Sequence, residues 1–225
     1  MNEMLTLLRK VYHRLQRILY FYKQFFTRRI TFINNSFSKQ LALTFDDGPD
    51  PVLTGKILDF LSENNIYATF FLSGPAIEKV PDMASRIVHE GHCIGNHGFE
   101  HVLPDKLMQD VLIKGFEKTD QLIKNISGVS NVRFYRPPYG KETKAFRSWI
   151  CKKSAWSVRW SLDSYDYRKD FTTDQRSEKL LHDIQNGEIL LFHDTKSETF
   201  ELLKLVVPVL QERKYQFMRL DERFS

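Results

Sequence analysis

Two adjacent carboxylates, Asp46 and Asp47, stand at the end of an apolar run in the sequence LALTFDDGPDP. Like charges this close oppose each other's ionisation, and an unpaired carboxylate is costly to bury. An Asp-Gly-Pro sequence is also ordinary turn chemistry. A second feature, the pair His97 and His101, suggests a use for the doublet. The four-residue spacing would place both imidazoles on one face of a helical turn, and two His with one Asp form a catalytic zinc set that leaves one position open.

The two carboxylates could then have separate tasks. One Asp would ligate the metal, and the other would take a proton from the attacking water. A bound cation would also allow both carboxylates to remain ionised at neutral pH. The residues alone do not indicate which Asp has which role.

Later segments contain the other groups that a hydrolase needs. Arg136 of RPPYG is a cationic fork that can hold the base carboxylate, and the amide of Tyr139, stiffened by two prolines, could serve as an oxyanion donor. His193 ends an apolar run and suits a general acid, whose pKa Asp166 of DSYDY would raise. Three aromatic residues would line the mouth of the site, where they suit sugar faces or ordinary packing: Phe99, Tyr165 and Tyr167.

The elements that must position these residues alternate between strand and helix periodicity. Strand-like segments cover residues 41–45, 66–73, 92–95, 132–135, 155–162, 188–192 and 215–220, and helical patterning occurs between them, as in 104–125 and 173–185. This alternation predicts parallel α/β architecture with about seven strands, as a barrel or near-barrel. Because loops after parallel strands gather at one rim, we expect the candidate residues to meet there. Taken singly, each has a structural alternative, such as a surface cation or a stiff turn.

Charge is unevenly distributed along the 225 residues. Residues 1–40 contain eight Lys or Arg and one Glu, whereas the rest of the chain contains 25 basic and 27 acidic residues. The formal charge of +5 therefore belongs to the N-terminal segment. A basic footprint spread over the domain is absent from the composition, which argues against a nucleic-acid partner.

The N-terminal segment has the pattern of an amphipathic helix with a basic face. Its apolar residues recur at alternating steps of three and four between Leu5 and Phe26. Such a helix could dock on its own domain, pair with a partner helix, or contact an anionic membrane surface through residues 1–30. Residues 31–40 read as a polar linker, which divides the chain into a segment 1–40 and a catalytic domain 41–225. Without a signal peptide or an apolar run long enough to span a bilayer, the expected location is cytoplasmic, with peripheral contact at the inner membrane surface.

Five segments occur in an order that resembles the motifs of the polysaccharide deacetylases, carbohydrate esterase family 4 with its NodB-like domain: TFDDGPD, HGFEH, RPPYG, DSYDY and ILLFHD. The resemblance covers about residues 40–220. It implies a distorted (β/α) barrel and metal-dependent hydrolysis of acetyl groups, usually N-acetyl groups of GlcNAc-containing glycans. Zinc is the default metal for a His-His-Asp site, and Co²⁺ or Mn²⁺ are alternatives.

The resemblance also assigns roles. Asp46 would be the general base, oriented by Arg136, and the metal ligands would be Asp47, His97 and His101. The Tyr139 amide would stabilise the oxyanion. His193, tuned by Asp166, would protonate the departing amine after water deprotonated by Asp46 attacks the acetamide carbonyl.

Two positions depart from the family pattern and bear on substrate preference. Gly98 stands where Ser or Thr is usual, and Tyr167 replaces the usual Trp. Two other functions compete with N-deacetylation. An O-acetyl esterase would use the same residues, whereas a catalytically silent glycan-binding domain would have lost Asp46, a ligand or His193, all of which are present.

Overall fold

The structure is a computed structural model that describes residues 27–33 and 38–224, together with eight residues between 11 and 23. The predicted N-terminal amphipathic helix lies mostly outside the described residues. Ile18 is partly buried, and five of the segment's described apolar side chains are exposed: Val11, Tyr12, Leu15, Leu19 and Tyr22. The three alternatives for this segment therefore stay predictions.

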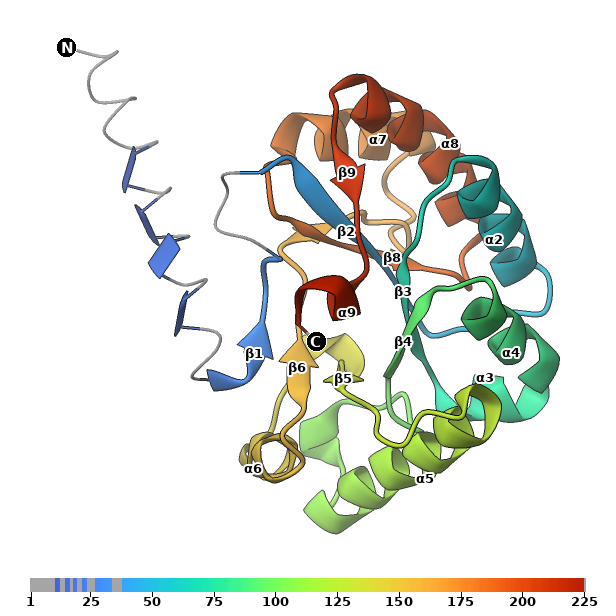
Figure 1. Ribbon diagram of the computed structural model, residues 1–225, viewed down its shortest axis with the longest axis vertical. Coiled ribbons are helices and arrows are strands. Elements are labelled where there is room, and N and C mark those ends of the chain that lie inside the picture. Colours follow the sequence, from blue (N-terminus) through green and yellow to red (C-terminus); the bar gives the residue numbers. More distant parts are fainter. Residues whose placement is uncertain are drawn as a thin grey trace.

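Parallel strands form one curled sheet at the centre of the domain (Figure 1). In spatial order they are β1 (Arg29–Ile30), β6 (Trp156–Val158), β5 (Phe134–Tyr135), β4 (Cys93–Asn96), β3 (Thr69–Leu72), β2 (Gln40–Asp46), β8 (Ile189–His193) and β7 (Leu162–Asp163), and β9 (Gln216–Phe217) also pairs with β2. Every pairing within this sheet is parallel. The predicted distorted (β/α) barrel is confirmed, in the form of a barrel that is open between β1 and β7.

Helices cover the outer face of the sheet (Figure 1). They are α2 (Leu53–Glu63), α3 (Gly74–Lys79), α4 (Pro81–His89), α5 (Gln109–Ser127), α6 (Lys144–Lys152), α7 (Thr173–Asp183) and α8 (Ser197–Glu212), and the short α9 (Leu220–Arg223) follows β9. Short 3₁₀ turns occupy Pro104–Lys106 and Pro138–Gly140. The helical pattern expected from residue 104 begins as such a turn, and the α-helix itself starts at Gln109.

The side chains of β2 show how the sheet directs its residues. Leu41, Leu43 and Phe45 belong to the large cluster that packs the sheet against the helices, whereas Ala42 belongs to the smaller cluster on the inner face. Because side chains alternate along a strand, Thr44 and Asp46 share the inner face with Ala42. The strand therefore delivers Asp46 to the inside of the barrel at its carboxyl end.

Strand β1 is a feature that the sequence did not reveal. Its Ile30 is fully buried in the inner cluster, and so is Ile33, which lies in the segment interpreted as a polar linker. The main chain of Ile33 is also held, because its N–H donates to the carbonyl of Gly187 at 3.0 Å. Two isolated isoleucines in polar surroundings carry no periodicity, so pattern analysis had no signal to detect.

The segment 155–162, expected as one strand, is divided between both ends of the sheet. β6 pairs with β5 and β1 at one end, and β7 pairs with β8 at the other. Residues 159–161 therefore cross the open side of the barrel. The sheet has nine strands where seven were expected, because the segment 155–162 forms two strands and β1 was not expected.

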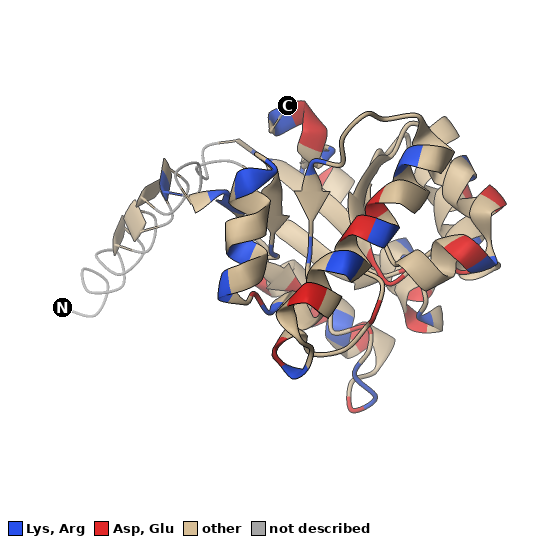
Figure 2. Cartoon of the chain, turned by 90° about the horizontal axis from the view of Figure 1, so that it is seen from below, with Lys and Arg blue, Asp and Glu red and all other residues tan. Residues whose placement is uncertain are grey.

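The surface of the described domain carries both charge signs. Lys and Arg are interspersed with Asp and Glu over the domain in Figure 2, which agrees with the near balance of charges after residue 40. No helix in the described part of the chain is long and apolar enough to cross a membrane.

Candidate active site

A cavity of about 360 Å³ opens at the carboxyl ends of the parallel strands. Its lining comes from segments that follow β2, β4, β5, β6, β7 and β8: Asp46, Asp47, His97, His101, Tyr139, Trp160, Asp163, Tyr167, Leu191, His193 and Lys196. Seven of the candidate residues named from the sequence thus meet at one rim, as parallel topology predicts: Asp46, Asp47, His97, His101, Tyr139, Tyr167 and His193.

Three of these side chains present ligand atoms to a common point. Oδ1 of Asp47 lies 3.3 Å from Nε2 of His97 and 3.1 Å from Nε2 of His101. The ligand atoms of all three residues lie within 4.8 Å of one another. This spacing and the donor types suit a divalent cation such as Zn²⁺.

A buried oxygen supports this fit. Oδ1 of Asp47 is shielded from solvent and has no hydrogen-bond donor among the described residues. Burial alone would raise the pKa of Asp47, but the imidazoles of His101 and His97 lower that pKa far below its usual range. The carboxylate oxygen and the two ring nitrogens thus converge on one point, as the ligands of a divalent cation would.

The loops that carry these ligands are irregular and firmly held. Asp47 has a φ of 78°, and its carbonyl accepts a hydrogen bond from the hydroxyl of Ser73 at 2.9 Å. The buried carboxamide of Asn96 precedes His97 and accepts the N–H of Gly98 at 2.7 Å. His97 and His101 lie on an extended loop, which corrects the expected helical turn, because Gly98 adopts a φ of 88° that interrupts any helix.

The geometry distinguishes the two carboxylates of the doublet. Asp46 is buried and bonds to Nη1 of Arg136 at 2.7 Å, while its other oxygen lies 3.9 Å from Nε2 of His97. Asp47 faces both imidazoles, whereas Asp46 faces the guanidinium. The residue types left this division open, and the geometry favours Asp47 as the metal ligand and leaves Asp46 free to act as the base.

Arg136 is fully buried, which makes its orientation well defined. Besides Asp46 it donates to the hydroxyl of Thr44 at 2.8 Å and to the carbonyl of Val158 at 3.3 Å. Its guanidinium carbon lies 4.1 Å from the ring centre of Phe71. Burial lowers the pKa of Arg136, and the charge of Asp46 opposes that effect. A fixed guanidinium of this kind holds its carboxylate partner in one orientation.

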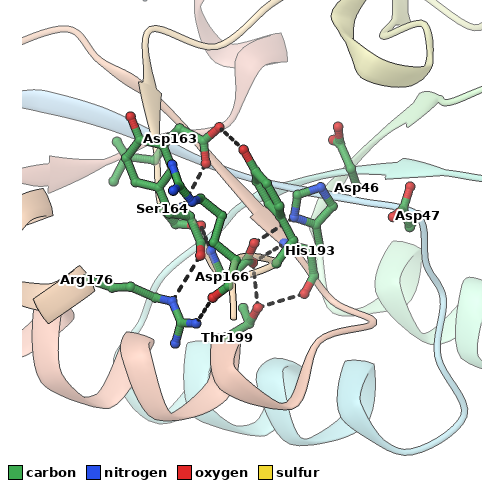
Figure 3. Close-up of polar contacts among 12 residues, drawn as sticks. Asp46, Asp47, Asp163, Ser164, Asp166, Arg176, His193 and Thr199 are labelled. Atoms are coloured by element: carbon green, nitrogen blue, oxygen red, sulfur yellow. Dashed lines mark hydrogen bonds and ion pairs between the residues drawn. The ribbon is translucent and has the colours of Figure 1, made fainter. Parts of the chain in front are cut away.

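His193 lies between Asp166 on one side and the Asp46-Asp47 pair on the other (Figure 3). Its Nδ1 is 2.8 Å from Oδ1 of Asp166, and its main-chain N–H donates to Oδ2 of Asp166 at 2.6 Å. The hydroxyl of Thr199 donates to the same oxygen at 2.6 Å. Burial would lower the pKa of His193, but the hydrogen bond and charge of Asp166 outweigh it and raise the pKa to about 9. His193 is therefore protonated at neutral pH and can act as an acid.

Tyr139 lies in the lining of the cavity and has a strained backbone. Its φ is 59°, an uncommon value for an aromatic residue, and hydrogen bonds from Gly140 to Pro137 and from Lys141 to Pro138 close the turn around it. The Tyr139 ring packs 4.8 Å from that of His101. A fixed main chain beside the metal ligands is the arrangement that an oxyanion donor requires.

The predicted aromatic lining is only partly correct. Tyr167 lines the cavity, with its ring edge-on to His193 at 5.5 Å. Phe99 lies outside that lining, because its ring packs against Gly74 and beneath the ammonium of Lys118. Tyr165 also lies outside, with its ring stacked on that of Phe171 at 6.0 Å.

Three lining residues were missed by the sequence analysis: Trp160, Leu191 and Lys196. Trp160 belongs to the crossing between β6 and β7, which the sequence showed as continuous strand. Lys196 follows His193 by three residues and carries no motif of its own, so only its place in the fold reveals it.

Comparison with known proteins agrees with this geometry. The sequence model of the family named polysaccharide deacetylase matches residues 34–153. The chain is also 34% identical over 190 residues to a peptidoglycan-N-acetylglucosamine deacetylase of Bacillus cereus, covering 83% of this chain and 68% of that protein. This chain belongs to the polysaccharide deacetylase family.

One more curated relative and one solved structure are similar to this chain over most of its length. A chitooligosaccharide deacetylase of Azorhizobium caulinodans is 30% identical over 197 residues, which cover 79% of this chain and 91% of that protein. The crystal structure of a peptidoglycan N-acetylglucosamine deacetylase in complex with a substituted benzamide superposes with a TM-score of 0.82. That structure is 31% identical and is matched over 88% of this chain and 92% of its own length.

Proposed function

We propose that this protein is a metal-dependent hydrolase that removes N-acetyl groups from GlcNAc-containing glycans and releases acetate. One observation carries the proposal: a single cavity joins the His-His-Asp cluster, the Arg136-held carboxylate of Asp46 and the Asp166-held imidazole of His193. Membership of the deacetylase family and the activities named for its relatives support the choice of an acetamide as substrate.

The metal would be held by Asp47, His97 and His101. A divalent cation there, with zinc as first candidate and cobalt or manganese as alternatives, would polarise the acetamide carbonyl and lower the pKa of water. The described residues do the rest of the chemistry. Asp46 takes a proton from the attacking water, and Arg136 keeps the carboxylate aimed at it.

The later steps concern the oxygen and nitrogen of the acetamide. As water adds to the carbonyl carbon, negative charge develops on the oxygen, and the N–H of Tyr139 donates a hydrogen bond to it. His193 then gives its proton to the nitrogen while the C–N bond breaks. The products are acetate and the free amine of the sugar, and Asp166 stabilises the imidazolium until that transfer occurs.

The first test is acetate release from a short GlcNAc oligomer by metal-stripped protein, with and without added zinc, beside an Asp46→Asn variant. Metal-dependent acetate that disappears in the variant is the expected result. An O-acetyl esterase would release acetate only from acetylated xylan, assayed in parallel. A silent glycan-binding domain would release none from either substrate, and both of these results would contradict the proposal.

A further inference from the structure

The cavity contains a lysine that the proposed mechanism does not use. Lys196 lies between β8 and α8, and its side chain is half-buried in the lining. Within the part of the chain that the structure describes, no hydrogen bond or ion pair joins its ammonium to another residue. A charged group that loses part of its hydration without gaining a partner is unfavourable, which suggests that the partner comes from outside the chain.

Four other cations near this end of the barrel already have partners. Arg136 pairs with Asp46, Lys141 with Asp105, and Arg168 with Asp170. Arg176 donates to the carbonyls of Tyr165 and Arg168. Of these five described cations, Lys196 is the one whose charged group has no partner within the described chain and is available to an external group.

Neighbouring acids within the lining are also engaged. Asp163 accepts the N–H of Tyr165 at 2.8 Å and the hydroxyl of Tyr167 at 3.2 Å. Asp46 is bound to Arg136, and Asp47 faces the two imidazoles. None of the three forms an ion pair with Lys196.

The place of Lys196 indicates which part of a substrate it would meet. Its main-chain N–H donates to the carbonyl of His193 at 3.2 Å, so it stands on the side of the general acid. The amine of the sugar leaves toward His193 in the proposed function. The sugar that carries this amine, or its neighbour in the glycan, therefore lies nearest to Lys196.

We propose that Lys196 is a specificity-determining residue that binds a carboxylate of the glycan, so that the enzyme prefers an anionic glycan to a neutral GlcNAc oligomer. The inference rests on the proposed function, because it assigns a substrate class to the same site. A carboxylate would give the half-buried ammonium the partner that this chain does not provide. A neutral glycan would leave that charge partly desolvated and unpaired.

The test compares glycans that differ only in charge. The first is a peptide-free tetrasaccharide of alternating N-acetylglucosamine and N-acetylmuramic acid, whose lactyl groups carry free carboxylates, and the second is its lactyl methylamide. A third substrate carries peptides on the lactyl groups, which places the carboxylates on the peptide instead of the sugar. For each, kcat/KM is measured by acetate release with the metal-loaded, full-length protein.

The expected result is a higher kcat/KM for the carboxylate form than for the methylamide. This ratio should fall about five- to tenfold in Lys196→Gln, as expected for loss of one charged hydrogen bond, and recover in Lys196→Arg. A matched control is Lys204→Gln, which removes an equal charge from α8 where Lys204 pairs with Glu201 at 2.7 Å. Raising the ionic strength should reduce the ratio in the unaltered protein.

The outcomes separate the two proposals. Equal rates on carboxylate and methylamide, or a ratio that Lys196→Gln does not change, would overturn the role of Lys196 while the deacetylase function stands. A preference for the peptide-bearing glycan alone, with equal rates on the carboxylate and methylamide forms, would also overturn the proposed contact with a sugar carboxylate. Failure to release acetate from any glycan would overturn the proposed function and this inference with it.

Discussion

Both oxygens of Asp166 are bound to His193, one to the imidazole Nδ1 at 2.8 Å and the other to the main-chain N–H at 2.6 Å. The ring is thereby fixed relative to the end of β8, and its other nitrogen, Nε2, is left for the substrate. Asp166 itself is buried and receives a third hydrogen bond from Thr199. The hydrogen bond and the charge of Asp166 are the main influences that raise the pKa of the His193 imidazole beside it.

We predict that Asp166→Asn shifts the alkaline limit of activity to lower pH. The pKa of His193 is raised to about 9, so its acid form is complete well below pH 9 and is lost as the pH rises through that value. Without the carboxylate, the strongest influences that oppose burial are lost and the pKa moves down toward its ordinary value of about 6.5, since only the charges of Asp46 and Asp47 still raise it. The pH profile of kcat should then fall near neutrality, with a loss of about 10- to 30-fold at pH 8.

A control for this prediction is Thr199→Val, which removes one donor to Asp166 and keeps the carboxylate. Its pH profile should lie close to that of the unaltered protein. A profile in Asp166→Asn that keeps its alkaline limit near 9 would show that another group sets that limit.

We predict that Asp46→Asn lowers kcat by about 100-fold or more and leaves metal binding nearly intact. The carboxamide occupies the same volume but cannot accept a proton from water at neutral pH. Because Asp47, His97 and His101 are unchanged, titration with Co²⁺ followed by absorption should give a similar dissociation constant. A loss of metal affinity equal to the loss of activity would instead assign Asp46 to the ligand set.

Metal removal should destabilise the protein as well as inactivate it. The charged, unsatisfied Asp47 carboxylate and two imidazoles form the expected site, and a ligand that binds only the folded state stabilises it. At a metal concentration 100 times the dissociation constant this effect is about 2.7 kcal/mol, or roughly 5–10 °C in Tm. In His101→Ala the metal-dependent shift should disappear at the same concentration, whereas His182→Ala, on exposed α7, should retain it.

The turn after the carboxylate doublet should tolerate no side chain at residue 48. A Cβ built on Gly48 would lie 2.0 Å from Oδ2 of Asp194, a fully buried carboxyl that also accepts the hydroxyl of Thr54 at 2.6 Å. Gly48→Ala must displace this buried group or the loop beside it. We expect a loss of about 1–3 kcal/mol in the free energy of unfolding by urea, together with reduced activity.

Gly55→Ala is the matched comparison on α2. There the new methyl group would meet only the flexible ends of Arg86 and Met83 at 3.4 Å, and alanine favours the helix. This variant should be neutral or slightly more stable. Equal stability of the two variants would mean that the turn at residue 48 adapts easily.

The membrane contact of residues 1–30 stays a proposal, and the fold determines how to test it. Ile30 and Ile33 are fully buried in the inner cluster, so a deletion that removes them should destabilise the domain by several kcal/mol. A chain that lacks residues 1–26 keeps both. We expect the full chain to float with vesicles that contain anionic lipid and the shortened chain to remain in the soluble fraction with similar deacetylase activity.

Flotation that is the same for both chains would refute the membrane role of this segment. Binding that depends on the segment but persists in neutral vesicles would point to its apolar face alone. The proposed cytoplasmic location requires a separate measurement, fractionation of the producing cells with detection of the chain.

Much of the site could be predicted because its chemistry lies in short, contiguous motifs. The alternation of strand and helix periods predicted parallel topology, and that topology brings the ends of β2, β4, β5 and β8 to one rim. The contacts of Arg136 with Asp46 and of Asp166 with His193 follow from this convergence. The spacing of His97 and His101 indicated a shared ligand point, although the expected helical turn was wrong.

The incorrect sequence predictions share one cause: they concern short features that leave no hydrophobic periodicity in the sequence. A two-residue strand such as β1 exists only because β6 lies beside it, and the break in the segment 155–162 exists because its ends pair with opposite ends of the sheet. Phe99 points away from the cavity because the positive φ of Gly98 redirects the chain toward α5. Such choices depend on distant partners that local sequence does not specify.

The sequence by itself determined the architecture and the family and named the candidate reacting groups, since each is encoded by residue type and by spacing along a few residues. Only the tertiary structure decided which carboxylate of the doublet faces the imidazoles, which aromatic rings reach the cavity, and that the ammonium of Lys196 stands there with no partner among the described residues. These are distances between residues far apart in the chain. They become fixed only when strand pairing and packing bring the loops together.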